Sequence, residues 1–147
     1  MKEHLLVPLA GTPESESVLA QLPRLAKRGS TVTLLRTEVP AALEQYADLS
    51  DAALAHAKRY LEKVKQRLSG LKVPVRTLAR IGAPAETILD VAREIGATLV
   101  VLSSSHHSPL ARFLFGSVPA TVVKRSAVPV LVLPVAAEEA VASAHNF

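Results

Sequence analysis

The sequence predicts a single doubly wound α/β domain, in which helices cover both faces of a parallel β-sheet. Short apolar segments typical of strands alternate along the chain with segments whose apolar residues have helical spacing. The segment 98–102 is almost entirely apolar, as is typical of a strand buried on both faces. The chain has 147 residues, enough for one such domain with a substantial core. We therefore expect a ligand crevice at the carboxyl ends of the strands, where the strand order reverses.

The first predicted strand and helix occupy the N-terminal 30 residues. Residues 4–9 form a strand-length apolar run. Thr12 followed by Pro13 is typical of a helix start, with threonine as the N-cap and proline at the first helical position. We expect Pro23 to kink this helix or to relax its first half, and Gly29 to end it. Glu14 and Glu16 are explained by the positive end of the helix dipole.

The second strand and helix follow the same order. Residues 31–36 are β-branched and apolar and predict a strand, and residues 37–49 are expected to be a loop. Ser50 and Asp51 are interpreted as the cap of a long helix that Gly70 ends. One stripe of that helix is apolar and is predicted to face the core; its residues are Leu54, Ala57, Leu61, Val64 and Leu68.

The C-terminal half continues the alternation. Residues 73–80 predict the third strand, Pro84 opens a helix that Gly96 closes, and residues 117–125 and 129–134 predict the last helix and strand. The inward face of the helix after Pro84 is predicted to carry Ile88, Leu89, Val91, Ala92 and Ile95. We expect residues 1–135 to form the domain and residues 136–147 to be a mobile or loosely docked tail.

Composition excludes several classes of protein. The chain has no cysteine, which rules out disulfides, thiol catalysis and zinc–thiolate sites. No apolar run approaches the roughly 18 residues that a membrane-spanning helix needs, and residues 1–10 lack a signal-peptide pattern. We therefore expect a cytoplasmic protein without a membrane partner. The net charge of +4 is spread among acidic residues, so no nucleic-acid partner is expected.

Several segments in order along the chain resemble the universal stress protein family. They are Gly82-x-Pro84-Ala85-Glu86-x-Ile88, Gly96-Ala97-x-Leu99-Val100-Val101, Gly116-Ser117-Val118 and Val128-Pro129-Val130-Leu131-Val132. Each segment is weak alone, but together they match the family from Leu5 to Pro134. The resemblance implies a five-stranded parallel sheet of order 3-2-1-4-5. It also implies a homodimer formed through strand five, with Val128, Val130 and Val132 at the interface.

The resemblance further implies a nucleotide site that has lost much of its motif. ATP-binding members of the family carry an Asp just after strand one and the motif G-x2-G-x9-G-[ST] after strand four. Here the Asp position is Ala10, and the first two glycine positions are Ser103 and His106. Only Gly116 and Ser117 match the end of the motif. Because the side chains at 103 and 106 crowd a phosphate loop and Ala10 lacks a carboxylate, we expect tight ATP binding to be lost.

The candidate site is therefore a degraded nucleotide or anion cleft. Thr37 falls where the family usually has an apolar residue against adenine, whereas Pro8 and Val118 match the family pattern. The predicted cleft residues are Pro8, Leu9, Ala10, Thr37, Ser103, Ser104, His106, His107, Arg112, Gly116, Ser117 and Val118.

The chemistry of the polar segment from Ser103 to Ser108 has two interpretations. It is either an anion or altered-nucleotide pocket, to which Arg112 and the helix start at Ser117 add positive charge, or a solvated loop. A metal site is disfavoured because adjacent histidines seldom both bind one ion. No nucleophile-elbow motif is present, so no catalytic residue is assigned. Arg36 and Arg80, at the ends of strands two and three, have two interpretations. They either line the mouth of the crevice, where they would suit an anionic ligand, or lie at the surface, which we favour.

The resemblance implies a non-catalytic regulatory or binding protein of the stress response that acts as a homodimer. Two alternatives remain open. One is a switch that binds ATP or AMP and hydrolyses it slowly or not at all. The other is a protein-interaction module that docks through the edge of strand five. No cofactor is expected unless an adenine nucleotide fills the cleft.

Overall fold

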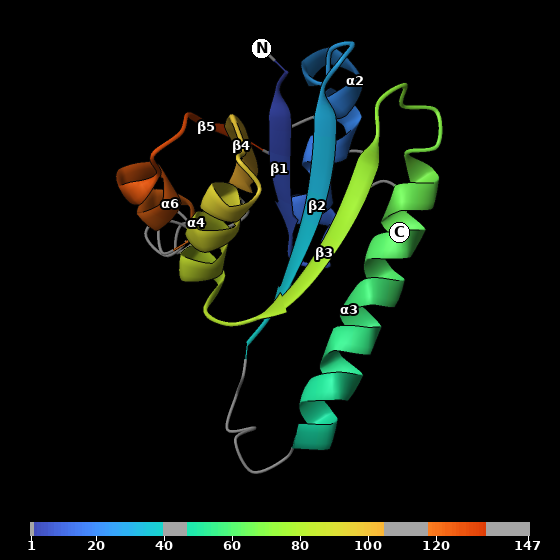
Figure 1. The fold of residues 1–147 in the computed structure, drawn as a ribbon, viewed down its shortest axis with the longest axis vertical. Coiled ribbons are helices and arrows are strands. Elements are labelled where there is room, and N and C mark those ends of the chain that lie inside the picture. The colour runs from blue at the N-terminus through green and yellow to red at the C-terminus, as the bar shows by residue number, and fades with distance from the viewer. Residues whose placement is uncertain (1, 40–46, 105–117, 135–147) are drawn as a thin grey trace, which may run out of the picture.

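A computed structural model describes residues 2–39, 47–104 and 118–134 (Figure 1). These residues form a five-stranded parallel sheet in the order β3-β2-β1-β4-β5, which confirms the predicted fold class and strand order. The strands are β1 (His4–Leu9), β2 (Thr31–Glu38), β3 (Val75–Ile81), β4 (Leu99–Ser104) and β5 (Val130–Pro134). The helices are α1 (Pro13–Glu16), the 3₁₀ helix η1 (Ser17–Gln21), α2 (Leu22–Leu25), α3 (Ala47–Arg67), α4 (Pro84–Glu94) and α6 (Pro119–Arg125).

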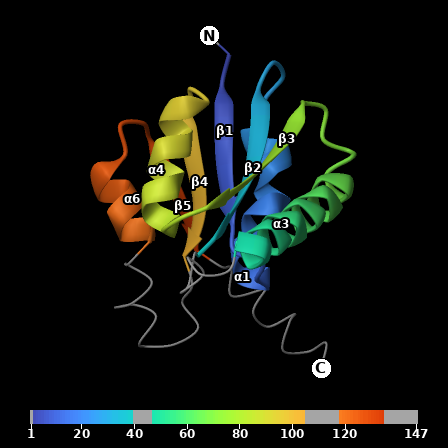
Figure 2. The ribbon, with the colours of Figure 1, turned by 60° about the horizontal axis from the view of Figure 1, so that its bottom comes forward.

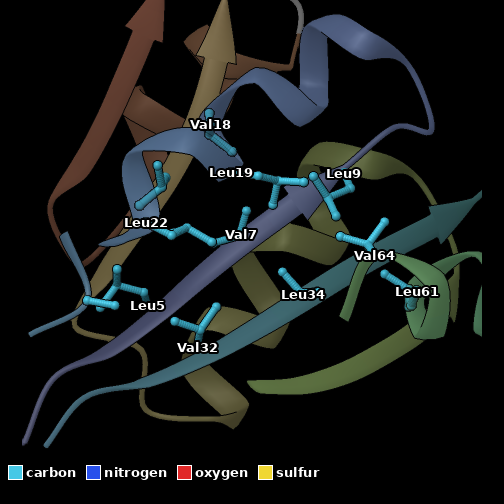
Figure 3. Packing of buried hydrophobic residues seen from close by; sticks show 12 residues of the cluster. Leu5, Val7, Leu9, Val18, Leu19, Leu22, Val32, Leu34, Leu61 and Val64 are labelled. Atoms are coloured by element: carbon cyan, nitrogen blue, oxygen red, sulfur yellow. The ribbon is translucent and has the colours of Figure 1, made fainter. Parts of the chain in front are cut away.

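The core has two halves, one on each face of the sheet. Along β1 the side chains of Leu5 and Val7 join one buried cluster, whereas Leu6 joins the other, because successive side chains of a strand point to opposite faces. Helix α4 and α6 cover one face and α3 lies on the other side of the sheet (Figure 2). Figure 3 shows the first cluster, in which helical residues pack onto β1 and β2; they are Val18, Leu19, Leu22, Leu61 and Val64.

Three strands extend beyond their predicted ends, and β3, which runs from Val75 to Ile81, does so by one residue. β2 continues to Glu38, which pairs with Ile81 of β3. β4 continues to Ser104, which pairs with Pro134 of β5. The prediction that a loop begins at Ser103 is therefore wrong. Serine has a weak strand propensity, but pairing with β5 keeps Ser103 and Ser104 in the strand.

The first helical segment begins as predicted and ends earlier. The Thr12 side chain accepts a hydrogen bond from the Ser15 N–H at 3.2 Å and caps α1. The segment then tightens to 3₁₀ geometry before α2, consistent with Pro23, which has no N–H to bond to a carbonyl one turn earlier. The predicted end at Gly29 is wrong: α2 ends at Leu25, and Gly29, with φ of +90°, lies in the turn before β2.

Two helix starts also differ from the predictions. α3 begins at Ala47, so Ser50 and Asp51 lie inside its first turns and do not cap it. Alanine and leucine in this region favour helix, and acidic residues are well placed near a helix N-terminus. α6 begins at Pro119 and not at Ser117, consistent with the preference of proline for the first helical position.

The predicted tail from 136 to 147 lies outside the described residues, so the domain boundary at 135 stays a prediction. Within the ranges that the structure describes, no helix is both long enough and apolar enough to cross a membrane. The cytoplasmic location also stays a prediction.

His4 gives the fold a predicted pH dependence. Its Nε2 lies 2.6 Å from the Thr33 hydroxyl, and burial, helped by the charge of Arg76, lowers the pKa of His4 from its ordinary value of 6.5. The unfolded chain therefore binds more protons than the folded chain between the lowered pKa and 6.5, so the free energy of unfolding should fall as the pH drops through that window.

Urea unfolding at pH 7.5 and pH 5.5 tests this prediction. We expect His4→Gln to lose less stability than the wild-type chain over this range, because glutamine does not titrate. His56 is exposed on α3, so His56→Gln should keep the wild-type pH dependence. Identical pH dependence in His4→Gln and the wild type would contradict the assignment.

Candidate functional site

A cavity of about 600 Å³ lies at the carboxyl ends of β1, β2 and β4. The N-terminal ends of α1, α4 and α6 complete its wall, through Thr12, Pro84 and Pro119. The strand order reverses between β1 and β4, and the carboxyl ends of strands at such a switch point are where doubly wound sheets bind ligands. The cavity is therefore the candidate functional site.

The structure brings several predicted site residues together around this cavity. They are Pro8, Leu9, Ala10, Thr37, Ser103 and Val118. Ser104 is buried at the end of β4 and does not line the cavity. The remaining predicted residues, His106, His107, Arg112, Gly116 and Ser117, lie outside the described residues, so their part in the site stays a prediction.

Other lining residues were missed by sequence reasoning. They all lie toward the carboxyl end of a strand or in the first two turns of a helix, which is the signal that could have found them once the topology was known. These residues are Thr12, Glu14, Ser15, Leu35, Glu38, Val39, Pro84, Ile88, Leu102 and Pro119.

In the turn between β1 and α1, which forms one wall of the cavity, polar groups form hydrogen bonds with one another. The Ala10 N–H donates to the Ser15 hydroxyl oxygen at 2.9 Å, and that hydroxyl donates to the Thr12 carbonyl at 3.0 Å. The turn is thus held by Ser15, and the side chain of Ala10, which lines the cavity, is a methyl group. A carboxylate at position 10, as in the ATP-binding pattern, is what this wall lacks.

Arg36 lines the cavity, so the surface position favoured from sequence is wrong for this residue. Its side chain is 20% exposed, its Nε lies 3.3 Å from a Glu38 carboxylate oxygen, and its guanidinium lies 5.6 Å from the centre of the Tyr60 ring. Arg80 does lie at the surface, where it forms an exposed ion pair with Glu94 at 2.8 Å. The two arginines differ in position because β2 pairs with β1 as far as Arg36, which lies opposite Leu9 and therefore next to the turn that follows β1.

Glu16 fixes the Tyr60 ring on which Arg36 rests. The Tyr60 hydroxyl donates to Glu16 at 2.7 Å, and the Arg67 guanidinium donates to its other oxygen at 2.6 Å. Burial acts to raise the pKa of Glu16, but the hydrogen bonds from Arg67 and Tyr60 outweigh it and leave the pKa below its ordinary value. Burial and the same hydrogen bond raise the pKa of Tyr60. Glu16 therefore joins α1 to α3, a role that its predicted helix-dipole interaction does not include.

Gly11 allows the close approach of Arg36 to the turn. Its φ is +75°, and a Cβ at this position would lie 3.1 Å from Arg36 Nη1. We expect Gly11→Ala to lower the free energy of unfolding by about 1–2 kcal/mol, the cost of a left-handed backbone conformation for an L residue. Urea unfolding measures this change. The control is Gly70→Ala, because Gly70 has open space around its α-carbon and no positive φ; a loss no larger than that of the control would contradict the prediction.

The described residues contain no cluster of three or more histidine, cysteine, aspartate or glutamate side chains that could hold a metal ion. The predicted pair His106–His107 lies outside them. The polar chemistry of the described cavity wall therefore rests on hydroxyls, one guanidinium and carboxylates.

Known proteins share both this sequence pattern and this fold. The chain is 30% identical over 86 residues to the universal stress protein MJ0577 of Methanocaldococcus jannaschii, an alignment that covers 58% of this chain and 53% of that protein. The chain thus spans about half the length of the curated relatives it matches. The solved structure of MJ0577 superposes with a TM-score of 0.77 at 25% identity, covering 90% of this chain and 95% of the other.

Two further solved structures of this fold contain adenine nucleotides. A universal stress protein in complex with cAMP has a TM-score of 0.69 at 21% identity and covers 91% of this chain and 98% of its own. A family protein from Arabidopsis thaliana with AMP bound has a TM-score of 0.68 at 19% identity, covering 93% and 94%. At these identities the likeness shows the fold. A sequence model of the universal stress protein family matches residues 1–134, and the chain belongs to that family.

Proposed function

We propose that this chain is a non-catalytic regulatory or binding member of the universal stress protein family whose cavity does not bind ATP tightly. The observation that carries the proposal is Ala10. It lines the cavity at the end of β1, where the ATP-binding pattern has an aspartate, and its N–H is already bonded to Ser15. The methyl side chain of Ala10 cannot form a hydrogen bond with a nucleoside, and its N–H is already used in the bond to Ser15.

The charges of the described wall support the same proposal. Glu14 and Glu38 line the cavity together with Arg36, which is paired with Glu38. Two carboxylates near a triphosphate raise its energy by Coulomb repulsion, most strongly where water is partly excluded. Ser103 adds a side chain at the end of β4, where the pattern has glycine.

The departures from the ATP-binding pattern are large enough to lower the affinity for ATP substantially. A lost hydrogen-bonded partner costs about 1–3 kcal/mol, and about 1.4 kcal/mol is a tenfold change in affinity. Two such losses cost about 2–6 kcal/mol, which would weaken a micromolar site by about one and a half to four orders of magnitude.

Isothermal titration of the purified chain with MgATP tests the proposal, alongside native mass spectrometry for co-purified nucleotide. We expect no binding in the low micromolar range and no retained nucleotide. A dissociation constant for MgATP at or below the low micromolar range would overturn the proposal.

A nucleotide switch is the second candidate function. It is favoured by the cavity itself, which persists at the switch point, and by the relatives solved with AMP and cAMP. Fewer phosphates would meet less repulsion from Glu14 and Glu38. Titration with AMP, ADP and cAMP under the same conditions separates this candidate, because the switch requires that one of them bind more tightly than ATP.

An interaction module is the third candidate function, with homodimer formation as its simplest form. β5 is an edge strand of the sheet, and its apolar side chains from Val130 to Leu133 are only partly buried. An apolar strand edge favours pairing with another chain. The interface proposed from this edge includes Val128, Val130 and Val132.

A further inference from the structure

Arg36 uses one of its N–H donors in a hydrogen bond to another described residue. Its guanidinium carries five N–H donors. Among the described residues its hydrogen-bond partner is Glu38, through Nε. The guanidinium lies 5.6 Å from the centre of the Tyr60 ring and close to Gly11, where a Cβ would lie 3.1 Å from Nη1. Within the part of the chain that the structure describes, the four N–H groups on Nη1 and Nη2 are therefore the donors that Arg36 can offer a ligand.

The rest of the described wall is mostly apolar. Leu35, Val39, Ile88, Leu102 and Val118 contribute hydrocarbon surface to the cavity, together with Pro8, Pro84 and Pro119. A cavity of about 600 Å³ with apolar walls and few polar groups is typical of a site for a small organic molecule. Such walls favour an apolar body, and the planar guanidinium favours a carboxylate, to which it can donate two parallel hydrogen bonds.

The two glutamates limit the charge of the ligand. Glu38 shares Arg36, and Glu14 lies in the same wall. A polyanion would meet both carboxylates, whereas one carboxylate can bond to Arg36 directly and leave its apolar remainder against the hydrocarbon wall.

We propose that this cavity binds a small monocarboxylate with an apolar body, and that Arg36 anchors its carboxylate. This inference names a ligand class for the cavity of the proposed function, and it rests on that function because ATP must not occupy the same space. The acidic residue of the ATP-binding pattern is replaced by Ala10, and the Arg36 guanidinium lies beside the same turn, so a single anionic group can be placed at Arg36.

Titration with octanoate and its uncharged isostere octanamide tests the inference. We expect octanoate to bind the wild-type chain at least tenfold more tightly than octanamide. Arg36→Met keeps an unbranched apolar stem and removes the guanidinium with its charge, so it should abolish that preference. Arg80→Met removes an exposed arginine outside the cavity and should leave the preference unchanged.

Amide chemical shifts give a second readout that does not depend on one variant. Octanoate should shift the amide signals of Ala10, Gly11 and Thr37, which surround Arg36, and Arg36→Lys should retain part of the preference because it keeps the charge. Equal binding of octanoate and octanamide, absent octanoate binding, or shifts confined to other regions would overturn the inference. MgATP titration of the same sample separates the two proposals: low micromolar ATP binding defeats the proposed function, whereas absence of binding by both ligands defeats only this inference.

Discussion

The triple variant Ala10→Asp, Ser103→Gly, His106→Gly is expected to bind MgATP at least tenfold more tightly than the wild-type chain. The change at position 10 restores a carboxylate to the cavity wall at the end of β1. Each polar partner regained contributes about 1–3 kcal/mol, and about 1.4 kcal/mol is tenfold in affinity. The changes at 103 and 106 remove side chains from the segment where the family pattern has glycine.

Isothermal titration measures the affinity gain, and the single variant Ala10→Asp shows how much of it comes from the carboxylate. Ala52→Asp is the matched control, because it adds the same charge at an exposed position on α3. The control should bind MgATP no better than the wild type. A triple variant that keeps the wild-type circular dichroism and melting temperature yet gains no affinity would contradict the explanation.

The parallel sheet and the general place of the cavity could be predicted from the alternation of strands and helices, whereas the strand order came from the resemblance to the universal stress protein family. Apolar runs such as 98–102 identify buried strands, and Pro84 identifies a helix start. Once the elements alternate, connection handedness and the switch-point rule leave few arrangements. Element ends were less predictable, since β4 extends to Ser104 only because β5 lies beside it.

The side-chain chemistry of the cavity could be predicted only in part. Ala10 and Thr37 follow from position along the chain, and both line the cavity. The position of the Arg36 side chain cannot be predicted from its place along the chain, because it depends on Tyr60 and Gly11, which lie in other parts of the sequence. Periodicity shows which face a residue occupies, but it does not show which long side chain reaches across a turn to meet another.

The β5 edge has the geometry that an antiparallel dimer needs. The Val100 N–H donates to the Pro129 carbonyl at 3.0 Å, and in a parallel ladder the bonds to one neighbour involve every second residue. The backbone groups of Val130 and Val132 therefore point away from β4, toward the side of β5 on which the described residues place no further strand. Two copies related by a two-fold axis can pair through these groups and cover each other's valine side chains, while the proline at position 134 limits the ladder.

Lysine at both Val130 and Val132 is expected to convert a dimer at tens of micromolar into a monomer, because like charges would meet across the two-fold axis. Sedimentation equilibrium measures the change. Val130 also packs against the core cluster beneath α4 and α6, so Val132→Pro provides a second test that removes an outward N–H without introducing charge. Val123→Lys is the matched control, since Val123 is 52% exposed on α6, and it should remain dimeric. A wild-type monomer at that concentration, or a dimer that persists in both the double-lysine and proline variants, would refute an interface through β5.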